Sequence, residues 1–189
     1  FMRDSDLELL ADVRQVLIGE ADSRVEEHIA HRENVLDNVQ REVTEFLGKI
    51  MARRVPIAVS ERARRLLRMS DEAATILKVT RRLRKQGQDF SDASRQVLLD
   101  VHDQVTAFGI KISGHLKYPR PKFDLTAVQS ESSALHELVR SSRQRQLNRI
   151  GPNDPDSPVR VLVELDILNA YERIRAYYLN VAETLAGGK

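Results

Sequence analysis

Two similar segments of the chain, residues 67–79 and 172–184, each place one carboxylate among apolar residues: Asp71 in the first and Glu172 in the second. In both segments an arginine is followed directly by an apolar residue, and the second segment begins 105 residues after the first. A repeat of this length indicates two copies of one helical unit rather than a solenoid of short repeats. It also allows carboxylates from two helices to meet inside the fold.

Each carboxylate continues the apolar stripe of its helix, because Asp71 lies four residues after Leu67 and Glu172 lies four residues after Leu168. A carboxylate buried on such a stripe must be protonated, paired or bound to a cation, since burying it bare costs several kcal/mol. Facing helices can offer such oxygens to iron or to a hard divalent cation. Alternatively, each carboxylate lies at the edge of its stripe and pairs with a nearby arginine. The arginines in reach are Arg64, Arg68, Arg173 and Arg175. Pairing is favoured, because one carboxylate per helix is a small ligand set.

Other candidate ligands are more simply explained as solvated helix faces. Glu33 and Asp37 are four residues apart and could supplement Asp71, and His28 and His31 are one turn apart. Charged neighbours surround both pairs, so a solvated face is favoured for each. The chain has no metalloprotease helix motif, no glutamate three residues before a histidine and no glycine-rich phosphate loop.

Composition indicates a helical protein. Hydrophobic residues make up 41% of the 189 residues, charged residues 31% and aromatic residues 5%, with no cysteine. Aliphatic helix packing fits this composition better than a sheet, and disulfides and thiolate metal sites are excluded. Net charge is +2, which does not indicate a nucleic-acid binder. No apolar run is long enough to span a membrane, and no signal peptide is expected. Phe1 before Met2 suggests a chain excised from a longer protein.

Hydrophobic periodicity and capping signals predict six helices and no strand. Their expected ranges are about 6–18, 23–53, 57–85, 92–117, 124–150 and 158–186. We therefore expect an all-α fold of two pseudo-repeated antiparallel three-helix bundles, one formed by residues 1–87 and the other by residues 88–189. The first helix should begin at a capping box made by Ser5 and Glu8.

Arginine clusters at residues 62–68, 81–85 and 140–149 have three interpretations. A solvated face is favoured. Contact with anionic lipid headgroups is the functional alternative, worth about 1 kcal/mol per basic residue. Nucleic-acid binding is disfavoured, because no aromatic residues are interspersed with these clusters.

The paired segments, together with the run Asn180-Val-Ala-Glu183, resemble the PhoU family, and residues 32–43 look like the second helix of that family. Residues 140–147 resemble the C-terminal cytoplasmic PhoU-like domain of bacterial sodium/phosphate cotransporters. The resemblance implies two three-helix repeats, each ending in a helix with a Glu/Asp-x-x-x-Asp motif. Complete motifs bind multinuclear metal clusters. Here Leu67 and Ala176 replace one acid of each motif, so the resemblance implies at most a single divalent cation or iron at Asp71 and Glu172, and no certain cofactor.

The function implied by the resemblance is regulation without catalysis. The protein would be a cytoplasmic domain at the inner face of the bacterial plasma membrane, belonging to a sodium-dependent phosphate transporter. It would modulate phosphate uptake or signalling by contacting the membrane portion of the same protein or a phosphate transporter. Anionic lipid contact and a homodimer are further expectations. The alternatives are a metal-dependent helical-bundle enzyme and a helical scaffold or dimerisation module.

Overall fold

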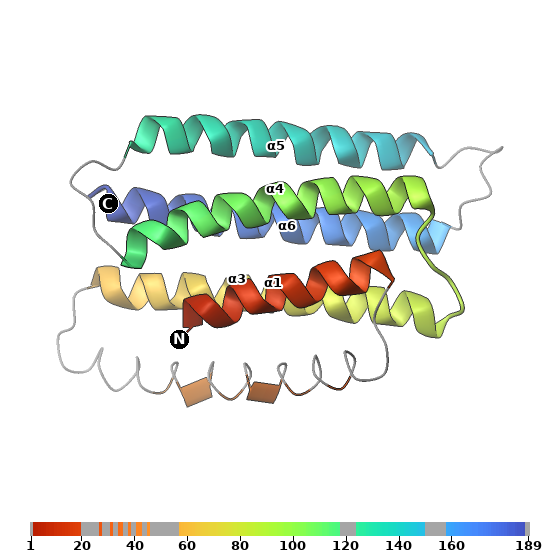
Figure 1. Cartoon of the computed structure of the whole chain (residues 1–189), viewed down its shortest axis with the longest axis horizontal. Helices are drawn as coiled ribbons and strands as arrows, with labels where there is room; N and C mark the ends of the chain where they lie inside the picture. The colour runs from red at the N-terminus through yellow and green to blue at the C-terminus, as the bar shows by residue number, and fades with distance from the viewer. Residues whose placement is uncertain are drawn as a thin grey trace.

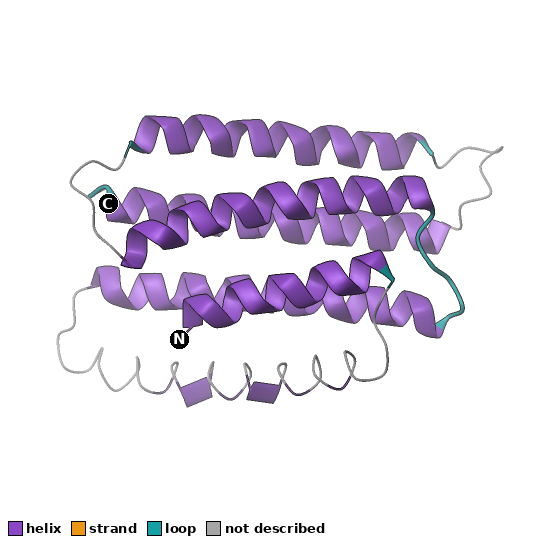
Figure 2. Cartoon of the chain, in the orientation of Figure 1, coloured by secondary structure: helices purple, strands orange, loops and turns teal. Residues whose placement is uncertain are grey.

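The computed structural model of the chain describes residues 2–19, 57–117, 124–149 and 158–187, together with residues 27, 31, 34, 35, 38, 41, 42 and 45. Every regular element within these residues is an α-helix (Figure 2), which confirms the all-α prediction. Most of the helix expected over residues 23–53 lies outside the described residues. The number of six helices and the division at residue 87 therefore stay predictions.

Five long helices are described: α1 (Met2–Ile18), α3 (Ile57–Lys85), α4 (Asp92–Lys117), α5 (Leu125–Asn148) and α6 (Pro158–Leu185). The expected bounds of α3, α4 and α6 are confirmed to within a residue or two. The expected start of α1 is wrong, because the helix begins at Met2 and continues through Ser5, which therefore cannot be its N-cap. A capping box in the sequence does not end a helix when the residues before it are also compatible with helix.

The ends of two helices follow from local chemistry. Gly87, with φ of 70°, ends α3 in a Schellman motif: its amide donates to the Arg84 carbonyl and the Gln88 amide donates to the Leu83 carbonyl. Asp124 is the N-cap of α5, and its side chain accepts a hydrogen bond of 3.0 Å from the Ala127 amide.

The helices lie along one long axis (Figure 1). Helix α6 contacts α3, α4 and α5, while α1 contacts α3 and α4. His102 of α4 contacts Tyr171 of α6, and Gly109, seven residues further along α4, contacts Tyr178, seven residues further along α6. The two helices therefore run in the same direction. Helix α5 runs opposite to both, as the colours of Figure 1 show. This antiparallel arrangement of α5 and α6 sets the register of the candidate site.

A single core of buried side chains extends through all five helices. Six residues of α4 recur at steps of three or four and form one stripe, and each of them is buried: Ser94, Leu98, Val101, Val105, Phe108 and Ile112. One close approach inside this core requires glycine. A Cβ at Gly109 would lie 2.4 Å from the Tyr178 ring, so α4 and α6 pack together only without a side chain there.

Two arginines fix the end of α1 against the rest of the bundle. The guanidinium of Arg84 on α3 donates to the Val16 carbonyl, and that of Arg95 on α4 donates to the Leu17 carbonyl. Asp89, in the connection between α3 and α4, pairs with Arg95 at 2.9 Å. Cations suit this position, because the last carbonyls of a helix carry partial negative charge. No helix within the described residues is both long enough and apolar enough to cross a membrane.

Candidate functional site

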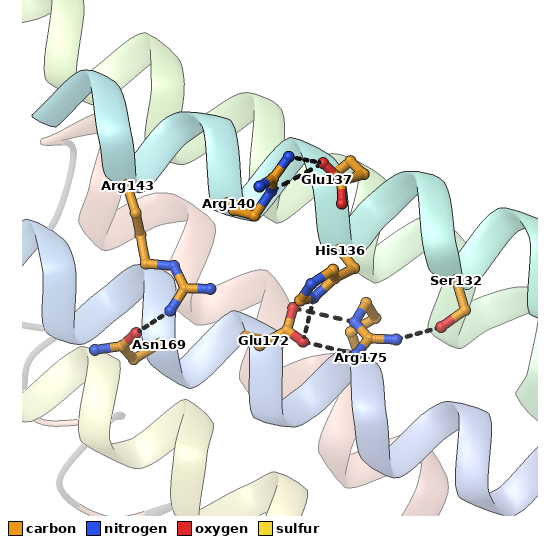
Figure 3. Close-up of polar contacts among 8 residues, drawn as sticks. All are labelled: Ser132, His136, Glu137, Arg140, Arg143, Asn169, Glu172 and Arg175. Atoms are coloured by element: carbon orange, nitrogen blue, oxygen red, sulfur yellow. Dashed lines mark hydrogen bonds and ion pairs between the residues drawn. The ribbon is translucent and has the colours of Figure 1, made fainter.

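Glu172 lies at the centre of a polar cluster between α5 and α6 (Figure 3). Its Oε1 accepts hydrogen bonds from Arg175 at 2.6 Å and from His136 Nδ1 at 2.8 Å, and its Oε2 accepts from Arg175 Nε at 3.1 Å. Arg175 also donates to the hydroxyl of the buried Ser132. Glu172 and Arg175 are one turn apart on α6, whereas Ser132 and His136 are one turn apart on α5. Two short helical spacings therefore build one four-residue cluster.

Burial and hydrogen bonding oppose each other at Glu172, whose side chain is 20% exposed. Burial raises the pKa of this carboxyl, but the hydrogen bonds from Arg175 and His136 and their charges lower it, and the net pKa lies below the ordinary value. Glu172 is therefore ionised at neutral pH, and both of its carboxylate oxygens accept hydrogen bonds. The expectation that it lies at the edge of the apolar stripe and pairs with a nearby arginine is confirmed.

Asp71 does not continue the apolar stripe of α3, and that expectation is wrong: its side chain is exposed. The buried face of α3 passes through Met69 and Ala73, and a residue two positions from each lies about 200° around the helix. The carboxylate that points toward α6 is that of the next residue, Glu72. Glu72 forms an ion pair of 2.7 Å with Arg173. The two repeated segments thus meet through Glu72 and Arg173.

The described residues do not fit a metal cluster. Among them, no three histidine, aspartate or glutamate side chains come close enough together to hold a metal ion. Both oxygens of Glu172 already accept hydrogen bonds from Arg175, so a cation there would have to displace that guanidinium. Metal binding at Asp71 and Glu172 stays a prediction, which the geometry of this part of the chain does not support. Glu33, Asp37 and His28 lie outside the described residues.

A buried histidine that sequence reasoning missed lies between α4 and α6. His102 Nδ1 is 2.9 Å from the Tyr171 hydroxyl, and Thr106 approaches its Nε2 at 3.4 Å. Burial lowers the pKa of His102 from 6.5 to about 4, a change that the charge of Asp103 opposes. Burial likewise raises the pKa of Tyr171. Both side chains are therefore neutral, and the pair is a structural hydrogen bond in the core. The available signal was the position of His102 beside Val101 and Val105 on the apolar stripe.

The arginines of α5 differ in their partners. Arg140 pairs with Glu137 at 2.7 Å, but Arg143 donates to the amide oxygen of Asn169 at 3.0 Å and Arg145 donates to the Ser142 hydroxyl at 3.1 Å. Arg149, the C-cap of α5, donates to the hydroxyls of Ser91, just before α4, and of Ser94 on α4. Arg140 and Arg145 are exposed, as expected of a solvated face, whereas Arg143 and Arg149 are half-buried and bond neutral groups.

Comparison with known proteins gives the fold. No model of a known protein family matches the chain. The chain is 26% identical over 178 residues to a phosphate-specific transport system accessory protein PhoU homolog of Pseudomonas putida, covering 87% of this chain and 66% of that protein. The structure of PhoU from Pseudomonas aeruginosa matches with a TM-score of 0.79 at 21% identity, over 97% of this chain and 90% of that one.

A second structure, that of the phosphate transport system regulatory protein PhoU from Streptococcus pneumoniae, matches with a TM-score of 0.69 at 16% identity. That match covers 98% of this chain and 91% of the other. The chain therefore has the PhoU fold, and these likenesses support the resemblance to the PhoU family. They do not extend to the cytoplasmic domains of sodium/phosphate cotransporters.

Proposed function

We propose that this protein is a PhoU-family regulator of phosphate transport, which acts by binding a partner protein and not by catalysis. The observation that carries the proposal is the agreement of nearly the whole chain with PhoU structures, joined to the sequence similarity to a PhoU homolog. The geometry of the candidate site is consistent with this role. Its acid, base and guanidinium groups are bonded to one another, as in a cluster that fixes two helices.

Two settings are compatible with this role. In the first, the chain is the cytoplasmic domain of a sodium-dependent phosphate transporter and contacts the membrane portion of the same protein. In the second, it is an accessory protein at the cytoplasmic face of the plasma membrane and contacts a separate phosphate transporter. The names of the similar proteins favour the second setting, because they refer to a phosphate transport system and its accessory or regulatory protein.

Phosphate flux is the direct test. In cells that lack the gene, the rate of labelled phosphate uptake should change at both low and high external phosphate, and a plasmid copy should restore it. The control is uptake of an unrelated solute, which should not change. Unchanged phosphate uptake under both conditions would count decisively against a regulatory role in phosphate transport.

Metal binding at Asp71 and Glu172 is a separate proposal with its own test. Protein purified without chelator and dialysed against metal-free buffer should be analysed for iron and divalent cations, alongside Glu172→Gln. A stoichiometric metal that this substitution removes would support the site. A metal content that is the same in both proteins would leave Glu172 with its helix-pairing role alone.

A further inference from the structure

We propose that the facing sides of α5 and α6 form a docking surface for an acidic amphipathic helix of a partner protein. This surface, the α5–α6 strip, consists of Arg140, Arg143 and Leu147 on α5 and of Leu162, Leu165 and Asn169 on α6. Within each helix the three residues follow the spacing i, i+3, i+7, so they share one face. The inference deepens the proposed function and rests on it, because it names where a regulator would bind its partner.

One end of the strip is apolar and exposed. Five large apolar side chains are exposed among the described residues, and two of them belong to the strip: Leu147 at 45% and Leu162 at 58%. The hydrogen bond from Arg143 to Asn169 sets the register of the antiparallel helices. One turn beyond Arg143, Leu147 therefore lies beside the second turn of α6, which carries Leu162. Clustered exposed apolar side chains with a polar rim are typical of interaction sites.

The adjoining part of the strip is cationic. Residues 137–149, which run through α5 to its C-cap, include four arginines and a single acid, Glu137, which pairs with Arg140. Arg143 is half-buried and bonds a neutral amide, and no carboxylate of the described residues pairs with it. The exposed acid of α6, Asp166, lies seven residues before Arg173 and shares its face of the helix, and Arg173 forms an ion pair with Glu72 of α3. Asp166 is therefore directed to the α3 side of α6, and the charge of Arg143 remains available to a partner.

A helix with carboxylates fits this arrangement better than the other occupants. A carboxylate on a partner helix can pair with Arg143, and a second one, one turn away, can share the exposed Arg140 with Glu137, while apolar residues of the partner cover Leu147 and Leu162. A second copy of this chain would bring the same arginines together, and like charges oppose such a contact. A lipid surface fits less well, because the Arg143 side chain bonds Asn169 on α6 and does not extend away from the helices.

Binding of two synthetic peptides tests the proposal. Both are helical, about 18 residues long, with one leucine stripe; one carries glutamates beside the stripe and the other carries lysines at the same positions. Fluorescence anisotropy with the full chain should give a micromolar Kd for the glutamate peptide and binding at least about fivefold weaker for the lysine peptide. Arg143→Gln and Leu162→Ser should each weaken the glutamate peptide by about fivefold. The matched controls, Arg82→Gln on α3 and Ile110→Ser on α4, should leave it unchanged.

Several results would overturn the proposal. These are equal affinity for the two peptides, or equal effects of the strip variants and their controls. Two other results would also overturn it. In the first, Leu162→Ser abolishes binding to vesicles of phosphatidylcholine and phosphatidylglycerol, while the wild-type chain binds the two peptides equally. In the second, Leu162→Ser dissociates a dimer of the chain. Circular dichroism confirms that each variant is folded. The peptide assay involves neither phosphate nor transport, so its failure is distinct from unchanged phosphate uptake, which would refute the proposed function instead.

Discussion

The buried His102 should make the protein less stable as the pH falls from 7 to 5. Unfolded histidine has a pKa near 6.5, whereas burial lowers the pKa of His102 to about 4 in the folded protein. Between these two values the unfolded chain binds a proton that the folded protein does not, so the free energy of unfolding decreases on acidification. The loss begins near pH 6.5 and is complete near pH 4.

The magnitude follows from the two pKa values. The whole interval corresponds to about 3 kcal/mol, at 1.36 kcal/mol for each pKa unit. About 2 kcal/mol of this is lost between pH 7 and pH 5, because the unfolded histidine is almost fully protonated at the lower pH while the folded one is not. Asp103, whose pKa is lowered chiefly by its hydrogen bond from Arg14, titrates below this range and does not contribute.

Urea unfolding followed by circular dichroism at pH 7 and pH 5 measures this loss. The matched variant is His102→Gln, which keeps a hydrogen-bonding side chain beside Tyr171 but cannot take up a proton. Its own stability at pH 7 is immaterial, because the comparison is between the two pH dependences. The wild-type protein should lose about 2 kcal/mol more than the variant. Equal pH dependence of the two proteins would refute the reasoning.

Three further substitutions test the packing and the site. Gly109→Ala should cost about 1–3 kcal/mol in urea unfolding, because a Cβ would lie 2.4 Å from the Tyr178 ring, whereas Gly114→Ala, with no atom within 4 Å of its Cβ, should be neutral or slightly stabilising. A clash relieved without cost would show that α4 and α6 can separate. Glu172→Gln should cost about 1 kcal/mol at pH 7, after allowance for partial exposure. Since the pKa of Glu172 is lowered, its contribution is lost as the pH falls below 4.5, and the gap to the wild-type protein should then close. Asp124→Ala should lower stability by about 1 kcal/mol through the lost N-cap, and an unchanged midpoint would mean that α5 begins elsewhere.

Local signals explain why most described helix bounds could be predicted. The Schellman glycine at position 87, the Asp124 cap and Pro158 at the first position of α6 each act within a few residues. The stripe of α4 could be predicted for the same reason, because a helix repeats its face every three to four residues. The start of α1 was predicted wrongly at Ser5, because a residue with a capping side chain can also lie inside a helix. Here the residues from Met2 onward are helical.

The candidate site depended on information that short segments do not carry. An error of one residue rotates a side chain by about 100°, and this separates Asp71, which is exposed, from Glu72, which faces Arg173. The partner of Glu172 could be predicted where it was local, as with Arg175 three residues later. His136 could not be predicted, because it is 36 residues away and its position depends on how α5 docks.

The docking of α5 is itself decided largely by polar groups, and this bears on the α5–α6 strip. Its six buried positions are Val128, Ser132, Leu135, Val139, Ser142 and Gln146, so half of them are polar. Apolar contacts are non-directional and tolerate small shifts of a helix, whereas hydrogen bonds do not. On one side Arg149 bonds Ser94 of α4 and Ser91 just before that helix. On the other side Ser132, His136 and Arg143 bond residues of α6. A slip of α5 by one turn would break all these contacts together. The register that brings Leu147 beside the first turns of α6 is therefore held by directional bonds, and the cluster around Glu172 supports the docking surface without taking part in it.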